Sequence, residues 1–186
     1  PIPIKNSKGE YTNVIKEKKM AVFNFLSGSS KKKWTKIDCF KVGEKLATFH
    51  LANSNNKLCL KNQFGINFWN KTFTNCRKRL NELIPNCVEI IEKEFLLVSK
   101  NWPKDLPAGV IHADLFPDNV FFENNSISGF LDFYFSCNDF LSYDLAILIN
   151  AWCFNNMRFN KDFFLSLLSG YESIRKLNKE EKRNMN

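Results

Sequence analysis

The spacing of apolar residues predicts two amphipathic helices in the first half of the chain. The first is capped by Thr35, which has the capping-box pattern with Asp38, and it is expected to end near Asn53. The second has Asn86 as a candidate cap, three residues before a glutamate. Residues 54–70 are rich in asparagine and lack a clear period, so they are predicted to form a loop. The apolar stripes are Cys39, Val42, Leu46 and Phe49 in the first helix, and Ile84, Val88, Ile91, Phe95 and Val98 in the second.

Alternating and short apolar runs predict strands in two other regions. Residues 1–26 are expected to form short strands joined by turns. After Gly109, strands are expected at residues 110–111, 120–122 and 127–133. The polar segment HADLFPDN therefore lies between two predicted strands.

The helical period returns after Asn138. One helix places Leu145, Leu148, Ile149 and Trp152 on one face, and another is expected over residues 161–177. A last helix, capped by Asn178, stops at residue 186 and is too short to be stable alone. Because the chain also begins with Pro1 instead of methionine, we expect it to be a fragment of a longer protein.

Length and composition indicate a globular protein of one domain or slightly more. A chain of 186 residues with 44% hydrophobic content can bury a core. The longest apolar runs fall far short of the roughly 18 residues of a membrane span, and no signal peptide opens the chain, so we expect a cytoplasmic protein without membrane association. The six cysteines form no CxxC pair and are predicted to be reduced core residues. Of the two histidines, His50 is interpreted as a helix residue that packs against the core.

The net charge of +8 is unevenly distributed. Residues 101–150 hold one basic side chain and seven acidic ones. An acidic segment in a basic protein suits a divalent cation that carries a polyphosphate, whereas a nucleic-acid-binding segment would be basic. The lysine runs at residues 16–19 and 31–33 are interpreted as solvated surface.

The segment HADLFPDN has the residue types that phosphoryl transfer to an alcohol needs. Asp114 and Asn119 are five residues apart, as in the kinase catalytic loop, and His112 matches the leading histidine of that loop. Asp132 follows in a Leu-Asp-Phe sequence, where kinases carry Asp-Phe-Gly. Each signal alone is ordinary turn or strand-end chemistry, and only their combination within residues 109–132 favours catalysis.

The sequences GVIHADLFPDNVFF and ISGFLDFYFSCNDFLSYDLAILINAWCF resemble the aminoglycoside and choline phosphotransferase-like superfamily, and within it the homoserine kinases of that fold. The resemblance extends to VGEKLATFHLA and LLSGYESIRKLNKEE and is most specific over residues 106–154. It implies an α+β, protein-kinase-like fold. Residues 1–26 would be a remnant of the small N-terminal lobe and hinge, and residues 27–186 a mainly helical C-terminal lobe that is incomplete at its C-terminus.

The resemblance also implies roles for individual residues. Asp114 would be the catalytic base for transfer of the γ-phosphoryl group of ATP, and Asn119 and Asp132 would ligate Mg²⁺. His112 would support the loop, and Asp144 would accept its backbone N–H groups. The first acceptor implied is L-homoserine, an intermediate of threonine biosynthesis, with choline, methylthioribose and aminoglycosides as alternatives. The sequence leaves the oligomeric state open.

Residues 21–28 resemble the last strand of the small lobe and the hinge, where backbone groups near Phe25 and Leu26 would meet adenine. A plain edge strand and turn is the alternative interpretation. The chain lacks the glycine-rich phosphate loop and the lysine that precede this region in the superfamily. Since both position and stabilise the phosphates, the 186 residues alone are expected to bind nucleotide poorly and to turn over little. A non-catalytic remnant that binds a partner is the competing hypothesis, and nucleic-acid binding through the lysine runs is a weaker one.

Overall fold

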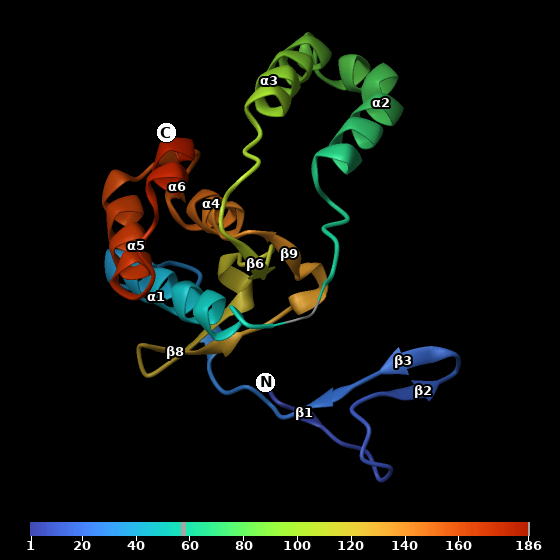
Figure 1. Cartoon of the computed structure of the whole chain (residues 1–186), viewed down its shortest axis with the longest axis vertical. Coiled ribbons are helices and arrows are strands. Elements are labelled where there is room, and N and C mark those ends of the chain that lie inside the picture. Colours follow the sequence, from blue (N-terminus) through green and yellow to red (C-terminus); the bar gives the residue numbers. More distant parts are fainter. Residues whose placement is uncertain (57–58, 186) are drawn as a thin grey trace.

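The structure, a computed structural model, describes residues 1–56 and 59–185. Figure 1 shows a helical body, a ribbon of strands that leaves the body on the N-terminal side, and a helical hairpin that projects from it. The helices of the body are α1 (Lys36–Ala52), α4 (Leu141–Trp152), α5 (Lys161–Ile174) and α6 (Lys179–Asn184), and the hairpin consists of α2 (Ile66–Leu83) and α3 (Cys87–Asn101). Together with short antiparallel strands, these helices confirm the predicted α+β class.

Local capping sets the ends of several helices. Thr35 Oγ1 accepts a hydrogen bond from Asp38 N at 3.4 Å, and Asp38 Oδ2 accepts one from Thr35 N at 2.9 Å, which completes the predicted capping box of α1. Asn178 and Glu181 form the same arrangement at α6. The predicted side-chain cap of α3 is wrong, because Asn86 has a left-handed backbone (φ 63°) and makes no capping hydrogen bond. Cap residues normally have an extended backbone, which aims the side chain at the first-turn N–H groups.

Helix α2 begins inside residues 54–70, which were predicted to be a loop. No residue of α2 is buried, and its cap, Gly65, has no side chain to accept a hydrogen bond. The helix therefore has no side-chain capping signal, but apolar residues do recur along one face at helical spacing, from Ile66 and Trp69 to Leu80 and Leu83, so the prediction of a loop overlooked a periodic pattern. Aromatic contacts attach it to the rest of the chain: the ring of Trp69 lies 5.5 Å from that of Trp102 and 6.5 Å from that of Tyr143.

Helices α1 and α5 lie in direct backbone contact. A Cβ atom at Gly43 would lie 2.1 Å from the carbonyl oxygen of Leu167, and one at Gly170 would lie 2.0 Å from that of Phe40. Only glycine fits at these two positions, so the helices approach closely enough for side chains of both to share one core. That core includes Val42, Leu46, Leu115, Val120, Leu145, Leu148, Trp152, Leu167 and Tyr171, which have no exposed surface.

Two small antiparallel sheets support the segment between residues 111 and 120. One pairs β6 (Ala108–Ile111) with β9 (Cys137–Phe140), and the other pairs β7 (Val120–Glu123) with β8 (Ser126–Phe130) and with β5 (Ser29–Ser30). The strands predicted at residues 110–111 and 120–122 are confirmed. The strand predicted over residues 127–133 is shorter, because it ends at Phe130 before the left-handed Asp132 (φ 61°). The last strands form a small hairpin, β10 (Phe154–Asn155) and β11 (Arg158–Phe159).

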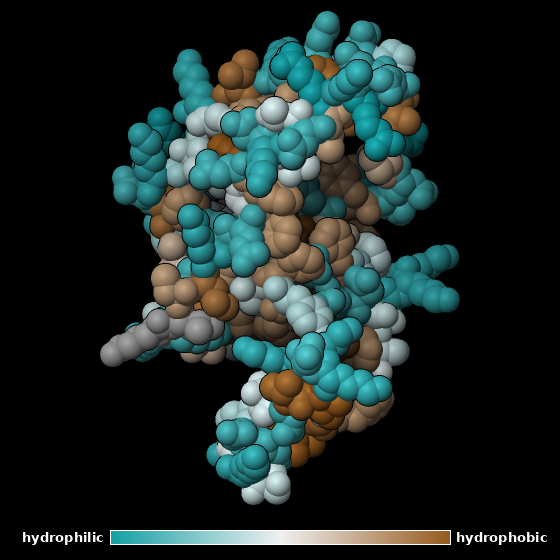
Figure 2. All heavy atoms as spheres, turned by 90° about the vertical axis from the view of Figure 1, so that its right-hand side faces the viewer, coloured by the Kyte–Doolittle hydropathy of each residue, from teal (hydrophilic) through white to brown (hydrophobic). Residues whose placement is uncertain are grey.

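The N-terminal ribbon has little core of its own. Strands β1 (Pro3–Ile4) and β4 (Val22–Phe23) pair, as do β2 (Asn13–Ile15) and β3 (Lys18–Met20). Val14 is 70% exposed and Phe25 is 91% exposed. Figure 2 shows brown, apolar atoms gathered on the lower projection, whereas the surface over α2 at the top is mostly hydrophilic. The short strands predicted within residues 1–26 are therefore present, as four strands of two or three residues each.

The cysteines differ from one another in burial. Cys39, Cys137 and Cys153 are buried, as predicted, but Cys59 and Cys76 are exposed, so the prediction that all six belong to the core is wrong. Cys76 lies on helix α2, none of whose residues is fully buried. None of the helices in the described ranges is long and apolar enough to cross a bilayer.

Candidate active site

Two polar segments meet at the edge of the small sheets. Residues 112–119 connect β6 to β7 and end in a short 3-10 helix (Pro117–Asn119), and Leu131-Asp132 follows β8. The N–H of Leu131 donates to the carbonyl of Asn119 at 2.9 Å, and Nε2 of His112 lies 2.9 Å from the carbonyl oxygen of Leu131. These contacts bring the two predicted segments together at one end of the helical body.

The side chain of Asn119 orients Asp114. Its Nδ2 donates to the carbonyl oxygen of Asp114 at 2.8 Å and to the carboxylate Oδ2 at 3.2 Å. The amide oxygen of Asn119 is therefore turned away from Asp114. Within the described part of the chain, no group donates a hydrogen bond to that oxygen or to the carboxylate of Asp132. Both are hard oxygen ligands of the kind that Mg²⁺ prefers.

Asp114 and Asp132 affect each other electrostatically. Burial raises the pKa of Asp114, and the negative charge of Asp132 raises it further, while His112 and the hydrogen bond from Asn119 act in the opposite direction. Two neighbouring carboxylates of like charge create a negative field, which a bound divalent cation would relieve. Residues 1–56 and 59–185 contain no cluster of three or more His, Cys, Asp or Glu side chains that would form a metal site by themselves. A cation here would take its other ligands from water or from a substrate, as Mg²⁺ commonly does with nucleotide phosphates.

His112 is fully buried beneath the loop. The N–H of Asp114 donates to its Nδ1 at 3.3 Å, so Nε2 carries the proton and donates to the carbonyl of Leu131. The ring also lies 4.5 Å from that of Phe133. Burial lowers the pKa of His112, although Asp144 opposes this effect. The imidazole is thus a neutral support of the loop, because both of its nitrogens are engaged with the protein.

The lowered pKa of His112 predicts a loss of stability in acid. His112 takes up a proton at about pH 6.5 in the unfolded chain and only at a lower pH in the folded chain. Its contribution to the free energy of unfolding is therefore complete above pH 6.5 and is lost as the pH falls below that value. Urea unfolding at pH 7.5 and 5.5 measures the difference, and His112→Asn should show a smaller acid loss. Since both proteins keep His50, equal losses would contradict this assignment.

Asp144 lies below the loop, in the first turn of α4. Its Oδ2 accepts from His112 N at 2.8 Å and its Oδ1 from Ala113 N at 2.9 Å, and the side chain has no exposed surface. Ala113 has φ 65°, a left-handed conformation that is uncommon for a residue with a Cβ atom. Trp152 Nε1 also donates to the carbonyl of Leu115 at 3.0 Å. Contacts from α4 therefore hold a strained backbone in one geometry.

A cavity of about 170 Å³ opens beside the Asp114 carboxylate. It is smaller than the roughly 300–1,000 Å³ typical of sites for drug-sized ligands. Among the described residues that line it, Asp114 is the one with a charged side chain, and the others are Asn62, Phe64, Ala113, Phe135 and Tyr143. Asn62 Nδ2 donates to Asp139 Oδ2 at 2.6 Å, which ties this wall to β9. The cavity suits a small molecule with a hydroxyl group directed at Asp114.

The structure brings five of the predicted residues to one place, namely His112, Asp114, Asn119, Asp132 and Asp144. Phe25 and Leu26 are not part of this group of contacts. The side chain of Phe25 is almost fully exposed, and Leu26 contacts Gly129 of β8, where an added Cβ would lie 3.0 Å from Leu26 Cδ2.

Sequence reasoning missed five residues near the site, namely His50 and the cavity-lining residues Asn62, Phe64, Phe135 and Tyr143. His50 of α1 is more than a core residue, because its ring hydrogen-bonds Asp144. A signal existed, since His50 continues the buried face of Val42 and Leu46 at a spacing of four, and a polar group on such a face requires a partner. Of the lining residues, Asn62 lies outside every quoted motif, and Tyr143 directly precedes Asp144 in the segment that resembles the superfamily, where no role was assigned to it.

Comparisons with known proteins show the family of the chain. The profile of the phosphotransferase enzyme family (APH) matches residues 13–177. Homoserine kinase of Parvibaculum lavamentivorans (strain DS-1) is 42% identical over 182 residues, which are 97% of this chain and 57% of that protein. Homoserine kinase of Rhizobium meliloti (strain 1021) is 41% identical, with 97% of this chain and 56% of that protein covered. The chain thus spans somewhat more than half the length of these curated relatives.

Solved structures show the same fold at low sequence identity. The amicoumacin kinase hAmiN, solved with AMP-PNP and Ca²⁺, superposes with a TM-score of 0.71 at 16% identity over 95% of this chain and 57% of that one. An aminoglycoside phosphotransferase from Alicyclobacillus acidocaldarius gives a TM-score of 0.67 at 12% identity, over 98% of this chain and 61% of that one. The protein-kinase-like fold implied by the sequence is therefore confirmed. Since the family profile matches most of its length, the chain belongs to the phosphotransferase enzyme family.

Proposed function

We propose that the protein containing this chain transfers the γ-phosphoryl group of ATP to the hydroxyl of L-homoserine. The observation that carries the proposal is the position of Asp114. Its carboxylate borders a cavity of about 170 Å³ on one side and is hydrogen-bonded to Asn119 on the other. The similarity to proteins named homoserine kinase supports the choice of acceptor.

Asp114 would act as the base of this reaction. As the acceptor oxygen bonds to phosphorus and the bond to the ADP oxygen breaks, the hydroxyl proton passes to the carboxylate of Asp114. The hydrogen bond from Asn119 Nδ2 keeps one carboxylate oxygen in place, so that the other is free to face the acceptor. The raised pKa of Asp114 makes its carboxylate a better proton acceptor than a fully solvated one.

Asn119 and Asp132 would hold Mg²⁺, and Phe25 and Leu26 would contact adenine. Magnesium, when bound, would neutralise charge on the phosphates and bring them close to the acceptor. Asn119 is suited to this because its amide nitrogen is used by Asp114 and its oxygen is left for a cation. The adenine contact is supported by sequence resemblance alone.

The cavity beside Asp114 has room for a compact acceptor such as an amino acid. Aminoglycosides and macrolides are much larger than an amino acid, and the aromatic rings of Phe64 and Phe135 limit the space next to Asp114. Choline and methylthioribose are small enough to be the alternatives. The four-carbon homoserine carries one hydroxyl group, which a single base at one end of the cavity can serve.

Release of ADP by the full-length gene product tests the acceptor. We expect turnover with L-homoserine, and little with choline, methylthioribose or kanamycin supplied in parallel at the same concentration. A preference for any of the other three would refute homoserine as the substrate while leaving phosphoryl transfer intact. No ADP release with any acceptor would favour the non-catalytic alternative.

A further inference from the structure

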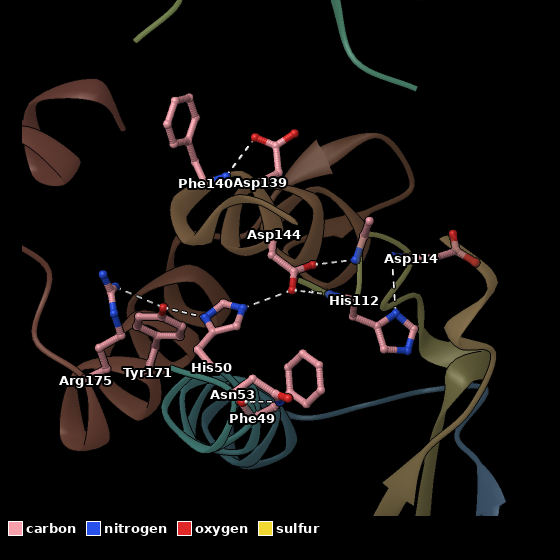
Figure 3. A network of polar contacts seen from close by, with 11 residues as sticks. Phe49, His50, Asn53, His112, Asp114, Asp139, Phe140, Asp144, Tyr171 and Arg175 are labelled. Atoms are coloured by element: carbon pink, nitrogen blue, oxygen red, sulfur yellow. Dashed lines mark hydrogen bonds and ion pairs between the residues drawn. The ribbon is translucent and has the colours of Figure 1, made fainter. Parts of the chain in front are cut away.

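A chain of buried polar groups continues behind Asp144 (Figure 3). His50 Nε2 lies 3.0 Å from Asp144 Oδ2, and His50 Nδ1 lies 2.8 Å from the hydroxyl of Tyr171. Arg175 Nη1 donates to the same hydroxyl at 3.1 Å. Asp144 and Tyr171 have no exposed surface, and His50 has 2%. The chain therefore links α1, α4 and α5 out of contact with water.

The two ends of this chain fix the direction of every hydrogen bond. Arginine only donates, so the Tyr171 oxygen accepts from Arg175 and its own proton points to His50 Nδ1. Nδ1 is then an acceptor, and the ring proton of His50 sits on Nε2, where it donates to the carboxylate of Asp144. The reverse tautomer of His50 would place a lone pair against the carboxylate and leave the Tyr171 hydroxyl proton without an acceptor.

Arg175, at the end of this series of hydrogen bonds, is held in place as well. Arg175 Nη2 donates to Glu181 Oε1 at 2.8 Å, and Glu181 Oε2 accepts from Asn178 N at 2.9 Å. Glu181 has no exposed surface, although it is a charged residue in the last helix. The guanidinium of Arg175 thus lies between the α5–α6 corner and the Tyr171 hydroxyl, and it cannot turn away from the hydroxyl without breaking a buried ion pair.

We propose that His50 and Tyr171 are positioning residues that hold Asp144, and through it the loop of Asp114, in the reactive geometry. Asp144 accepts both loop N–H groups, and one of them belongs to the strained Ala113. A carboxylate that rotates would release this backbone, and the hydrogen bond from His50 prevents the rotation. The link from loop geometry to turnover rests on the proposed function, whereas the link from Tyr171 to loop order does not.

Tyr171→Phe in the full-length protein tests the proposal, because it removes only the hydroxyl. We expect kcat to fall roughly 10- to 100-fold, with KM for ATP and for the acceptor within about twofold of wild type. Amide hydrogen exchange at His112 and Ala113 should accelerate about tenfold, because the loop opens more often. Ser166→Ala is the matched control, because it also removes a hydroxyl group from α5. The Ser166 hydroxyl donates to the backbone carbonyl of Lys36 at 2.6 Å and takes no part in the contacts of His50 and Asp144.

Two outcomes would overturn the proposal. One is wild-type exchange at His112 and Ala113 in folded Tyr171→Phe, and the other is an equal acceleration in Ser166→Ala. If exchange is faster in Tyr171→Phe but the wild-type protein shows no kinase activity, the proposed function is refuted and the positioning role is not. If Tyr171→Phe fails to fold, His50→Gln and His50→Leu replace it. The glutamine retains an N–H donor for Asp144, so its exchange at the loop should be slower than that of the leucine variant, and equal rates would again contradict the proposal.

Discussion

Asp114→Asn is expected to lower kcat by about 10²- to 10⁴-fold, the range that a general base contributes. Asparagine has the same shape and still offers an oxygen to Asn119 Nδ2, so the loop should keep its conformation. The substitution also removes a carboxylate whose pKa is raised by burial and by Asp132, so the free energy of unfolding should stay the same or increase. Steady-state ADP release and urea unfolding of the same preparation measure both effects.

Asp118→Asn is the control for this experiment. It removes a negative charge from the same loop, and Asp118 also raises the pKa of Asp114, but its side chain is exposed and does not line the cavity. Its kcat should stay close to that of the wild type. Near-normal turnover of Asp114→Asn would exclude Asp114 as the base, and an equal loss in Asp118→Asn would show that charge alone matters at this loop.

Local patterns were sufficient to predict the helices that face the core. The capping box of Thr35 and Asp38 and the stripe that includes Val42 and Leu46 lie within one segment, and the helix they define is present. The motif around Asp114 and Asn119 is local in the same sense, since both residues belong to one short connection between two strands. A signal of this kind is complete before any tertiary contact forms.

Features that arise from distant segments were not predictable. The apolar face of helix α2 is visible in the sequence, but the rings of two other segments that contact Trp69 are not. The contact of His50 with Asp144 joins residues 94 positions apart, and that of His50 with Tyr171 joins residues 121 positions apart. Periodicity shows that His50 lies on a buried face, but it does not reveal which buried carboxylate completes its hydrogen bonding.

Asp144→Asn should lower the free energy of unfolding by about 3 kcal/mol, the upper end of the cost of leaving a buried donor unpaired. The carboxylate accepts from three donors, His50 Nε2 and the N–H groups of His112 and Ala113. An asparagine amide has only one oxygen, so in either orientation its NH₂ group faces at least one of these donors. Each donor left unpaired in the interior costs about 1–3 kcal/mol. Urea unfolding at pH 7.5 gives the value directly.

The matched control for Asp144 is Asp162→Asn. Asp162 also occupies the first turn of a helix, α5, but it is exposed, so its replacement removes the same charge and the same helix-dipole interaction without stranding a buried donor. Its effect on unfolding should be much smaller. If the two variants lose equal stability, the three hydrogen bonds to Asp144 do not hold the loop. If Asp144→Asn alone is destabilised and its kcat also falls in the folded protein, then the strained Ala113 backbone, and with it the orientation of Asp114, depends on a carboxylate that never touches the substrate.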